Sequence, residues 1–228
     1  KEIATPRFGA GLDGVVSLLK RHNRIFGFLN GIDEADWSPA RPLDELPYTF
    51  SAESLEGKAL GKSHLQRQLD LPVAAEKPIF ILTSRLAEQK GYAYLPRAIE
   101  LVASKGDSQW VVTGDGEPAY VEAMRELESR FPEQVRYRPF SAQLERLLTR
   151  YGDFAVNAAW FEPSGLNQFF AMKNGTIPIV SAVGGLVDSV KRGVNGFLFN
   201  IAPGTGEAAY DVEKSARNVA RAARAAID

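Results

Sequence analysis

Cysteine is absent from the 228 residues of this chain, and histidine and methionine each occur only twice. A chain without cysteine cannot form disulfides, use a thiol as a nucleophile or bind a metal through thiolates. An excess of charge of one sign is also lacking, because the formal net charge is only -1. Such a chain has no general attraction for nucleic acid or for an acidic membrane surface. We therefore expect neither as a partner, and we expect specific residues to hold any anionic ligand.

Long apolar runs are missing as well. No stretch approaches the roughly 20 residues that a membrane-spanning helix needs, and the amino-terminal residues lack the pattern of a signal peptide. From these absences we expect a cytoplasmic protein, or a plastid protein if the source is a plant or an alga. The chain begins with Lys1 instead of Met, so we also expect a fragment that lacks a preceding domain.

The apolar residues that are present follow a βαβ rhythm from Glu76 onward, where short apolar runs alternate with amphipathic stretches. This rhythm predicts an α/β fold with a Rossmann-like parallel sheet and helices on both of its faces. The predicted strands are 78–83, 109–113, 135–137, 154–157, 177–181 and 196–199. The predicted helices are 94–104, 119–130, 142–151, 166–174, 186–190 and 208–227.

The first part of the chain has a different pattern. Residues 25–30 form a strand-like apolar run, and the stretch 37–48 is interrupted by Pro39, Pro42 and Pro47, as is typical of a connector. Residues 51–69 carry Ala, Leu, Lys and Gln at helical spacing, which predicts a helix that leads into the sheet.

Two cations follow the first predicted strand. In an open parallel sheet, ligands bind outside the carboxyl ends of the strands, so the loops at that edge are candidates for a site. One such loop carries Arg85 and Lys90 and ends at Gly91. A guanidinium can grip two oxygens and an ammonium adds a point charge, so this pair suits a diphosphate. The alternative interpretation is a solvated loop with two surface cations that bind no ligand, which would have the same spacing.

A glycine motif follows the second predicted strand. Gly114 to Ala119 match G-x-G-x-x-A and open a helix, whose amino terminus would favour a phosphate. A dinucleotide-binding motif also requires an acidic residue at the end of the next strand, and here that strand ends in Arg136-Tyr137-Arg138. A glycine turn that allows close packing is the alternative interpretation.

A carboxylate and a glycine follow the fourth predicted strand. Glu162 stands shortly before Gly165 and Leu166, whose backbone N–H groups lie at a helix start and are available to an anion. An anion bound there would place Glu162 beside a sugar. A Glu near a helix start is also favourable without any function. The glycine pair at 184–185 follows the next strand at the same edge of the sheet, which favours a ligand site.

Together these segments resemble the glycogen and starch synthase family, retaining glycosyltransferases of the two-Rossmann-domain (GT-B) type. The resemblance covers nearly the whole chain and includes SRLAEQKG at 84–91 and FEPSGLNQ at 161–168. The other similar stretches are 2–14, 27–39, 58–69, 113–118, 175–178 and 184–190.

The resemblance implies a set of catalytic residues. Arg85 and Lys90 fall where the family binds the donor diphosphate. Glu162 falls where the family places its active-site carboxylate, and Asn30 falls where it lines the donor-sugar cleft. In this arrangement the two cations and a helix terminus neutralise the leaving diphosphate, so neither a metal nor a cofactor is expected.

The resemblance also implies nucleotide-binding residues. Phe140 aligns with an aromatic position that stacks on the donor base. Gly165 and Leu166 would donate main-chain hydrogen bonds to the phosphates, and Gly116 would let the backbone approach the nucleotide.

The fold and activity that the resemblance implies are those of the C-terminal domain of a GT-B enzyme. Residues 1–48 would be the end of the acceptor domain and the connector, and residues 49–228 the nucleotide-sugar-binding domain. The enzyme would transfer glucose, with retention, from ADP-glucose to the non-reducing end of an α-1,4-glucan, and UDP-glucose stays open as a donor. Its partners would be the donor, the glucan acceptor and the missing N-terminal acceptor domain.

Departures from the family pattern keep a second function open. The family has Pro-Ser-Arg before Phe-Glu-Pro, and this chain has Ala-Ala-Trp at 158–160. Ser164 and Asn167 stand in place of the usual Cys and Thr. Related transferases often carry a second Glu near Phe170, where this chain is aromatic, but glycogen synthases of the bacterial and plant type also lack that carboxylate. The alternative is a catalytically silent glucan-associated or regulatory nucleotide-binding module.

Overall fold

The computed structural model describes residues 2–6, 9–43, 47–205 and 210–228. In these residues the centre of the fold is a parallel sheet of six strands in the order β3-β2-β1-β4-β5-β6. The strands are β1 (Ile79–Thr83), β2 (Gln109–Thr113), β3 (Val135–Arg138), β4 (Phe154–Asn157), β5 (Ile177–Ser181) and β6 (Phe197–Phe199). Every strand end lies within one residue of its predicted position, and the α/β prediction is confirmed.

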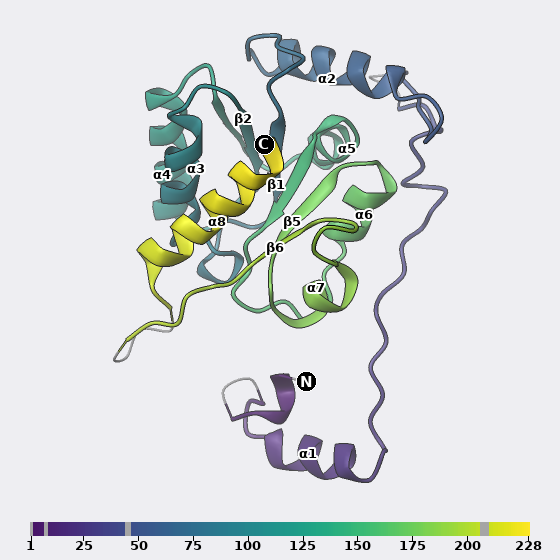
Figure 1. Cartoon of the computed structure of the whole chain (residues 1–228), viewed down its shortest axis with the longest axis vertical. Coiled ribbons are helices and arrows are strands. Elements are labelled where there is room, and N and C mark those ends of the chain that lie inside the picture. Colours follow the sequence, from purple (N-terminus) through teal and green to yellow (C-terminus); the bar gives the residue numbers. More distant parts are fainter. Residues whose placement is uncertain (1, 7–8, 44–46, 206–209) are drawn as a thin grey trace.

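Helices cover both faces of the sheet (Figure 1). One face carries α3 (Leu95–Ala103), α4 (Pro118–Arg130) and α8 (Val212–Ile227), and the other carries α2 (Glu56–Gln68), α5 (Ala142–Tyr151), α6 (Asn167–Lys173) and α7 (Gly184–Ser189). Helix α2 begins at Glu56 instead of Ser51. Of the predicted last helix, 208–209 lie outside the described residues. Among the described helices, none is long and apolar enough to span a bilayer.

The strands are mainly apolar because both faces of the sheet are covered, although β3 carries Arg136 and Arg138. Phe80 and Leu82 of β1 lie in the cluster under α3 and α8, whereas Ile79 and Ile81 lie in the cluster under α2 and α5. Phe80 also stacks on Trp110 of β2 with ring centroids 4.4 Å apart. Alternate residues of one strand therefore fill two separate cores, as in other parallel sheets buried on both sides.

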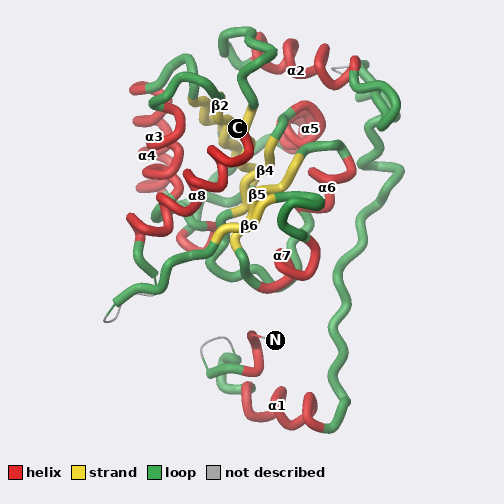
Figure 2. Tube along the Cα trace, in the orientation of Figure 1, coloured by secondary structure: helices red, strands yellow, loops and turns green. Residues whose placement is uncertain are grey.

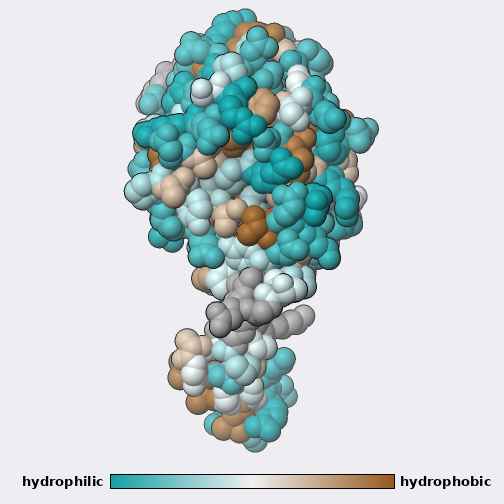
Figure 3. All heavy atoms as spheres, turned by 90° about the vertical axis from the view of Figure 1, so that its left-hand side faces the viewer, coloured by the Kyte–Doolittle hydropathy of each residue, from teal (hydrophilic) through white to brown (hydrophobic). Residues whose placement is uncertain are grey.

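The amino-terminal segment lies apart from the sheet (Figure 2). It contains η1 (Glu2–Ala4) and α1 (Asp13–Arg21), followed by an extended stretch without helix or strand at 24–33. The strand-like run at 25–30 therefore pairs with no strand in the described part of the chain, and Phe28 is 89% exposed. Hydrophobic residues also lie on the surface of the lower lobe in Figure 3. The exposed hydrophobic residues of the amino-terminal segment include Ile3, Leu12, Val15 and Leu18.

The connector after this stretch docks on α5 and α6. Trp37 stacks on Phe170 of α6 with ring centroids 3.8 Å apart. Arg146 of α5 pairs with the Asp36 carboxylate and lies over the Trp37 ring, 5.0 Å from its centroid. Arg150 donates to two carbonyl groups of the connector. Phe170 thus packs the connector against the sheet domain. The predicted domain boundary at residue 48 stays a prediction.

Lys58, in the first turn of α2, joins this helix to the ends of α5 and α6. Its ammonium donates to the carbonyl oxygens of Arg150 and Asn174 at 2.8 and 2.9 Å and to the Thr176 hydroxyl at 3.0 Å. Burial lowers the pKa of Lys58 to about 8, although the charge of Asp153 opposes this shift. The protein therefore stabilises the neutral form of this amine relative to water.

Raising the pH from 8 to 10 is expected to stabilise the fold through Lys58. In this window the folded state loses the proton at a pKa of about 8, while the unfolded state keeps it up to 10.5, so the free energy of unfolding rises with pH. The expected gain is about 1 to 3 kcal/mol. Urea unfolding of the chain and of Lys58→Met at both pH values measures this, because titration of other groups cancels in the difference. If the difference in the free energy of unfolding between the two proteins is the same at both pH values, the prediction is contradicted.

Candidate functional site

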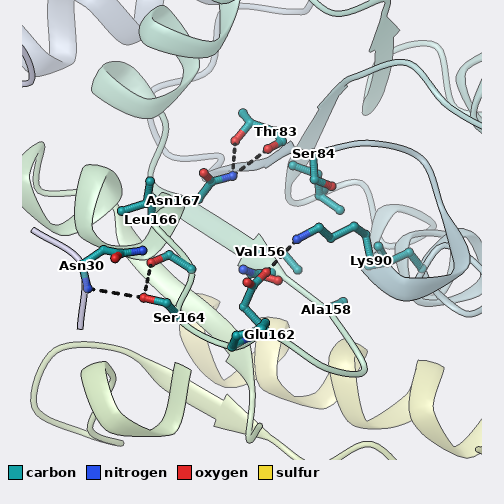
Figure 4. Close-up of a pocket in the computed structure, with 15 residues that line it drawn as sticks. Asn30, Thr83, Ser84, Lys90, Val156, Ala158, Glu162, Ser164, Leu166 and Asn167 are labelled. Atoms are coloured by element: carbon teal, nitrogen blue, oxygen red, sulfur yellow. Dashed lines mark hydrogen bonds and ion pairs between the residues drawn. The ribbon is translucent and has the colours of Figure 1, made fainter. Parts of the chain in front are cut away.

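A pocket opens between the carboxyl ends of β1 and β4. In the strand order β3-β2-β1-β4-β5-β6 the chain reverses direction across the sheet at this pair, and open α/β sheets bind ligands at such a switch point. The cavity has a volume of about 450 Å³. Residues after β1, residues after β4, the start of α6 and one residue of the extended amino-terminal stretch line it (Figure 4).

Five of the predicted site residues line this one pocket: Asn30, Lys90, Glu162, Gly165 and Leu166. They come from three separate parts of the sequence, so the fold brings them together. The other three, Arg85, Gly116 and Phe140, are not among its lining residues. The roles of all eight residues stay predictions, since a pocket locates side chains without assigning their chemistry.

An ion pair between Lys90 and Glu162 lies inside the pocket. The Lys90 Nζ is 2.6 Å from the Glu162 Oε2, and the two side chains are 21% and 13% exposed. Figure 4 shows the two side chains pointing toward one another from opposite loops. A short contact between largely buried charges is stronger than a surface ion pair. The lining of the pocket therefore contains one cation and one carboxylate in direct contact.

The loop that carries Glu162 packs against α7. Gly185 N–H donates to the Glu162 carbonyl at 3.0 Å. A Cβ atom on Gly185 would lie 2.5 Å from the Ser164 Cα, so no larger residue fits without moving this loop. The glycine pair singled out in the sequence thus supports the carboxylate loop through backbone packing.

Asn167 and Thr83 join the pocket from neighbouring elements and were not among the predicted site residues. The Asn167 Nδ2 donates to the Thr83 carbonyl at 2.7 Å and to its hydroxyl at 3.2 Å, which fixes the start of α6 to the end of β1. Asn167 stands where the resemblance leads one to expect Thr, and this difference was the sequence signal that could have indicated the contact. Asn30 N–H donates to the Ser164 hydroxyl at 3.4 Å, which links the amino-terminal stretch to the same loop.

Arg85 and Phe140 lie beyond the pocket lining. Arg85 lies two residues after the end of β1 and is exposed. Phe140 follows β3 and is 55% exposed, and its N–H donates to the Asp115 carboxylate at 3.3 Å. Both residues stand at the carboxyl edge of the sheet, which is the edge that carries the pocket.

A family model of the group 1 glycosyl transferases matches residues 68–214. The chain belongs to this family. Curated relatives include a glycogen synthase of Kosmotoga olearia, 43% identical over 84% of this chain and 40% of the relative. Another is a glycogen synthase of Anaeromyxobacter dehalogenans, 38% identical over 99% of this chain and 47% of the relative. The chain thus spans less than half the length of these relatives.

A solved structure with the same fold is the catalytic domain of starch synthase IV from Arabidopsis thaliana, bound to ADP and acarbose. Its TM-score to this chain is 0.80, with 28% sequence identity over 99% of this chain and 45% of that one. This glycosyltransferase domain therefore has the Rossmann-like architecture that the sequence predicts, and its neighbours are GT-B enzymes.

The glycine motif at 114–119 has a packing role in this glycosyltransferase. A Cβ on Gly116 would lie 2.1 Å from the Leu86 carbonyl oxygen, and Leu86 N–H donates to the Asp115 carbonyl at 3.0 Å. The motif therefore brings the loop after β2 against the loop after β1, as the close-packing interpretation requires. At the end of β3, where a dinucleotide motif needs an acid, Arg138 pairs with Glu128 at 3.0 Å.

Proposed function

We propose that this chain is the nucleotide-sugar-binding half of an enzyme that transfers glucose from ADP-glucose to the non-reducing end of an α-1,4-glucan, with retention. The observation that carries the proposal is the Lys90–Glu162 pair in a pocket at the switch point of the sheet. The relatives named glycogen synthase and the starch synthase structure with ADP support it.

The proposed roles follow from charge and position. Lys90 neutralises charge that grows on the leaving diphosphate, and Arg85 adds a second cation from the same loop. In this proposal Glu162 and Asn30 contact the donor sugar, and the backbone N–H groups of Gly165 and Leu166 donate to the phosphates. No metal enters this proposal, and the described residues contain no group of three or more His, Asp or Glu that could hold one.

In the proposed enzyme, a second domain that is not part of these 228 residues forms the opposite side of the active-site cleft. We assign residues 1–48 to the end of an acceptor domain and its connector, and residues 49–228 to the donor domain. The α-glucan would bind between the two domains, where the donor sugar is shielded from water. A cytoplasmic location, or a plastid location in a plant or an alga, stays a prediction.

Calorimetric titration of the chain with ADP, UDP, ADP-glucose and UDP-glucose tests this proposal. We expect the two adenine nucleotides to bind more tightly than their uridine counterparts. Tighter UDP binding would replace ADP-glucose by UDP-glucose as the donor, and the absence of binding by all four compounds would contradict the nucleotide-sugar role.

The same titration with Phe140→Ala tests the base contact. An aromatic ring that stacks on a base contributes about 1 to 3 kcal/mol, so ADP affinity should fall by about 5- to 150-fold. Pyrophosphate has no base and is the matched control, whose affinity should not change. Equal losses for both ligands would show that Phe140 supports the fold and does not contact the base.

A further inference from the structure

Two loops of the pocket contact each other at consecutive residues. One is the loop after β1 with η2 (Glu88–Lys90), and the other is the stretch 158–162 after β4. Gly91 abuts the second loop at Ala158, since a Cβ on this glycine would lie 2.2 Å from the Ala158 carbonyl oxygen. At the other end, Lys90 reaches Glu162. Between these two ends the loops are joined by hydrogen bonds of Gln89.

Gln89 supplies the contacts in the middle. Its carbonyl oxygen accepts the Trp160 N–H at 3.0 Å, and its Nε2 donates to the Phe161 carbonyl at 2.7 Å. One residue is therefore bonded to two successive residues of the opposite loop. The first of these bonds uses only the backbone of Gln89 and survives a substitution. The second needs a side-chain amide of this length, because it must reach a carbonyl oxygen across the loop.

The position of Gln89 connects its side-chain bond to the ion pair. Gln89 directly precedes Lys90, and Phe161 directly precedes Glu162, so the bond joins the residues next to both charged groups. Gly185 N–H donates to the Glu162 carbonyl from the side of α7. A lysine side chain has four rotatable bonds, so its ammonium can take many positions. A backbone held in place narrows the range of these positions.

We propose that Gln89 is a positioning residue that sets the separation of the Lys90 ammonium and the Glu162 carboxylate in the pocket. It acts through the Phe161 carbonyl and does not itself contact a substrate. The part of this inference that concerns a diphosphate rests on the proposed function, whereas the part that concerns the ion pair does not.

NMR of the lysine ammonium groups tests the geometry without any ligand. The Lys90 signal is assigned by its loss in Lys90→Ala, and its order parameter should be high in the parent chain. In Gln89→Leu it should fall to the range of exposed lysines. Asn218→Leu on α8 is the matched control. It removes a similar hydrogen bond, in which the Asn218 side-chain amide donates to the Asn200 carbonyl at 2.8 Å. An unchanged Lys90 order parameter in Gln89→Leu would overturn the proposal.

Two further variants separate positioning from general stability. Gln89→Asn keeps the amide but is too short to reach Phe161, so it should behave as Gln89→Leu does, and it serves if Gln89→Leu fails to fold. Gln89→Glu keeps the length but loses the donor, and it should also release Lys90. A Lys90 order parameter equal to that of the parent chain in both variants would show that the side-chain bond does not position Lys90.

A double-mutant cycle with pyrophosphate tests the consequence for ligand binding. In the parent chain Lys90→Ala should weaken pyrophosphate binding by about tenfold or more. In the Gln89→Leu background the same change should cost less than about threefold, because Lys90 is already displaced. Equal losses in both backgrounds would overturn the link between positioning and binding. If the parent chain binds no pyrophosphate while Gln89→Leu still releases Lys90, the proposed function fails and the positioning role stands.

Discussion

Replacing Glu162 by Gln in the full-length protein is expected to lower kcat by about 100-fold or more, with a change in donor Kd of roughly threefold at most. The amide keeps the shape and the hydrogen-bonding capacity of the side chain but removes its charge. A contact that strengthens as positive charge develops on the sugar acts mainly in the transition state, so its loss appears in kcat. Glu162 is suited to this role because its side chain is only 13% exposed, and surrounding water weakens its charge little.

The measurement is glucan elongation from ADP-glucose by the full-length enzyme, with donor affinity measured separately by calorimetry. Glu122→Gln is the matched control, because its carboxylate lies on α4 and is 74% exposed. Normal turnover in Glu162→Gln would contradict the proposed role. A full-length parent protein that binds ADP-glucose but transfers no glucose would instead support the silent nucleotide-binding module.

Lys90→Ala is expected to weaken the binding of ADP and of pyrophosphate to this chain by about tenfold or more. Hydrogen bonds to charged groups contribute about 1.5 to 3 kcal/mol, and about 1.4 kcal/mol corresponds to a factor of ten. The substitution also leaves Glu162, its partner at 2.6 Å, without a cation, so an uncompensated carboxylate then faces the diphosphate. The second effect acts in the same direction as the first.

Calorimetry with both ligands checks this, and Lys105→Ala is the control because Lys105 is exposed and lies in the turn after α3, away from the pocket lining. Arg85→Ala extends the test, because Arg85 is exposed outside the lining and contributes only if its side chain turns toward the ligand. Unchanged dissociation constants in both Lys90→Ala and Arg85→Ala would contradict diphosphate binding by this loop.

The sequence was sufficient to predict the elements and the edge of the sheet where the site lies. Mainly apolar runs such as 109–113 and 154–157 form strands with the predicted ends, because strands buried on both faces of a sheet are rich in apolar residues. Since parallel strands share one carboxyl edge, the loops that carry Lys90 and Glu162 were expected on the same side of the sheet. The apolar run at 25–30 was less informative, because its side chains are largely exposed and no strand in the described ranges pairs with it.

Which residues of that edge meet in one pocket was decided by the tertiary structure. Lys90 and Glu162 are separated by 72 positions, and Asn167 and Thr83 by 84, so their contacts depend on the strand order that places β1 beside β4. Local periodicity carries no information about that order. The same holds for Gly116, whose need for glycine arises from the Leu86 backbone 30 positions earlier in the chain. Periodicity thus determined the elements of this domain, whereas long-range packing determined the partners of its charged side chains.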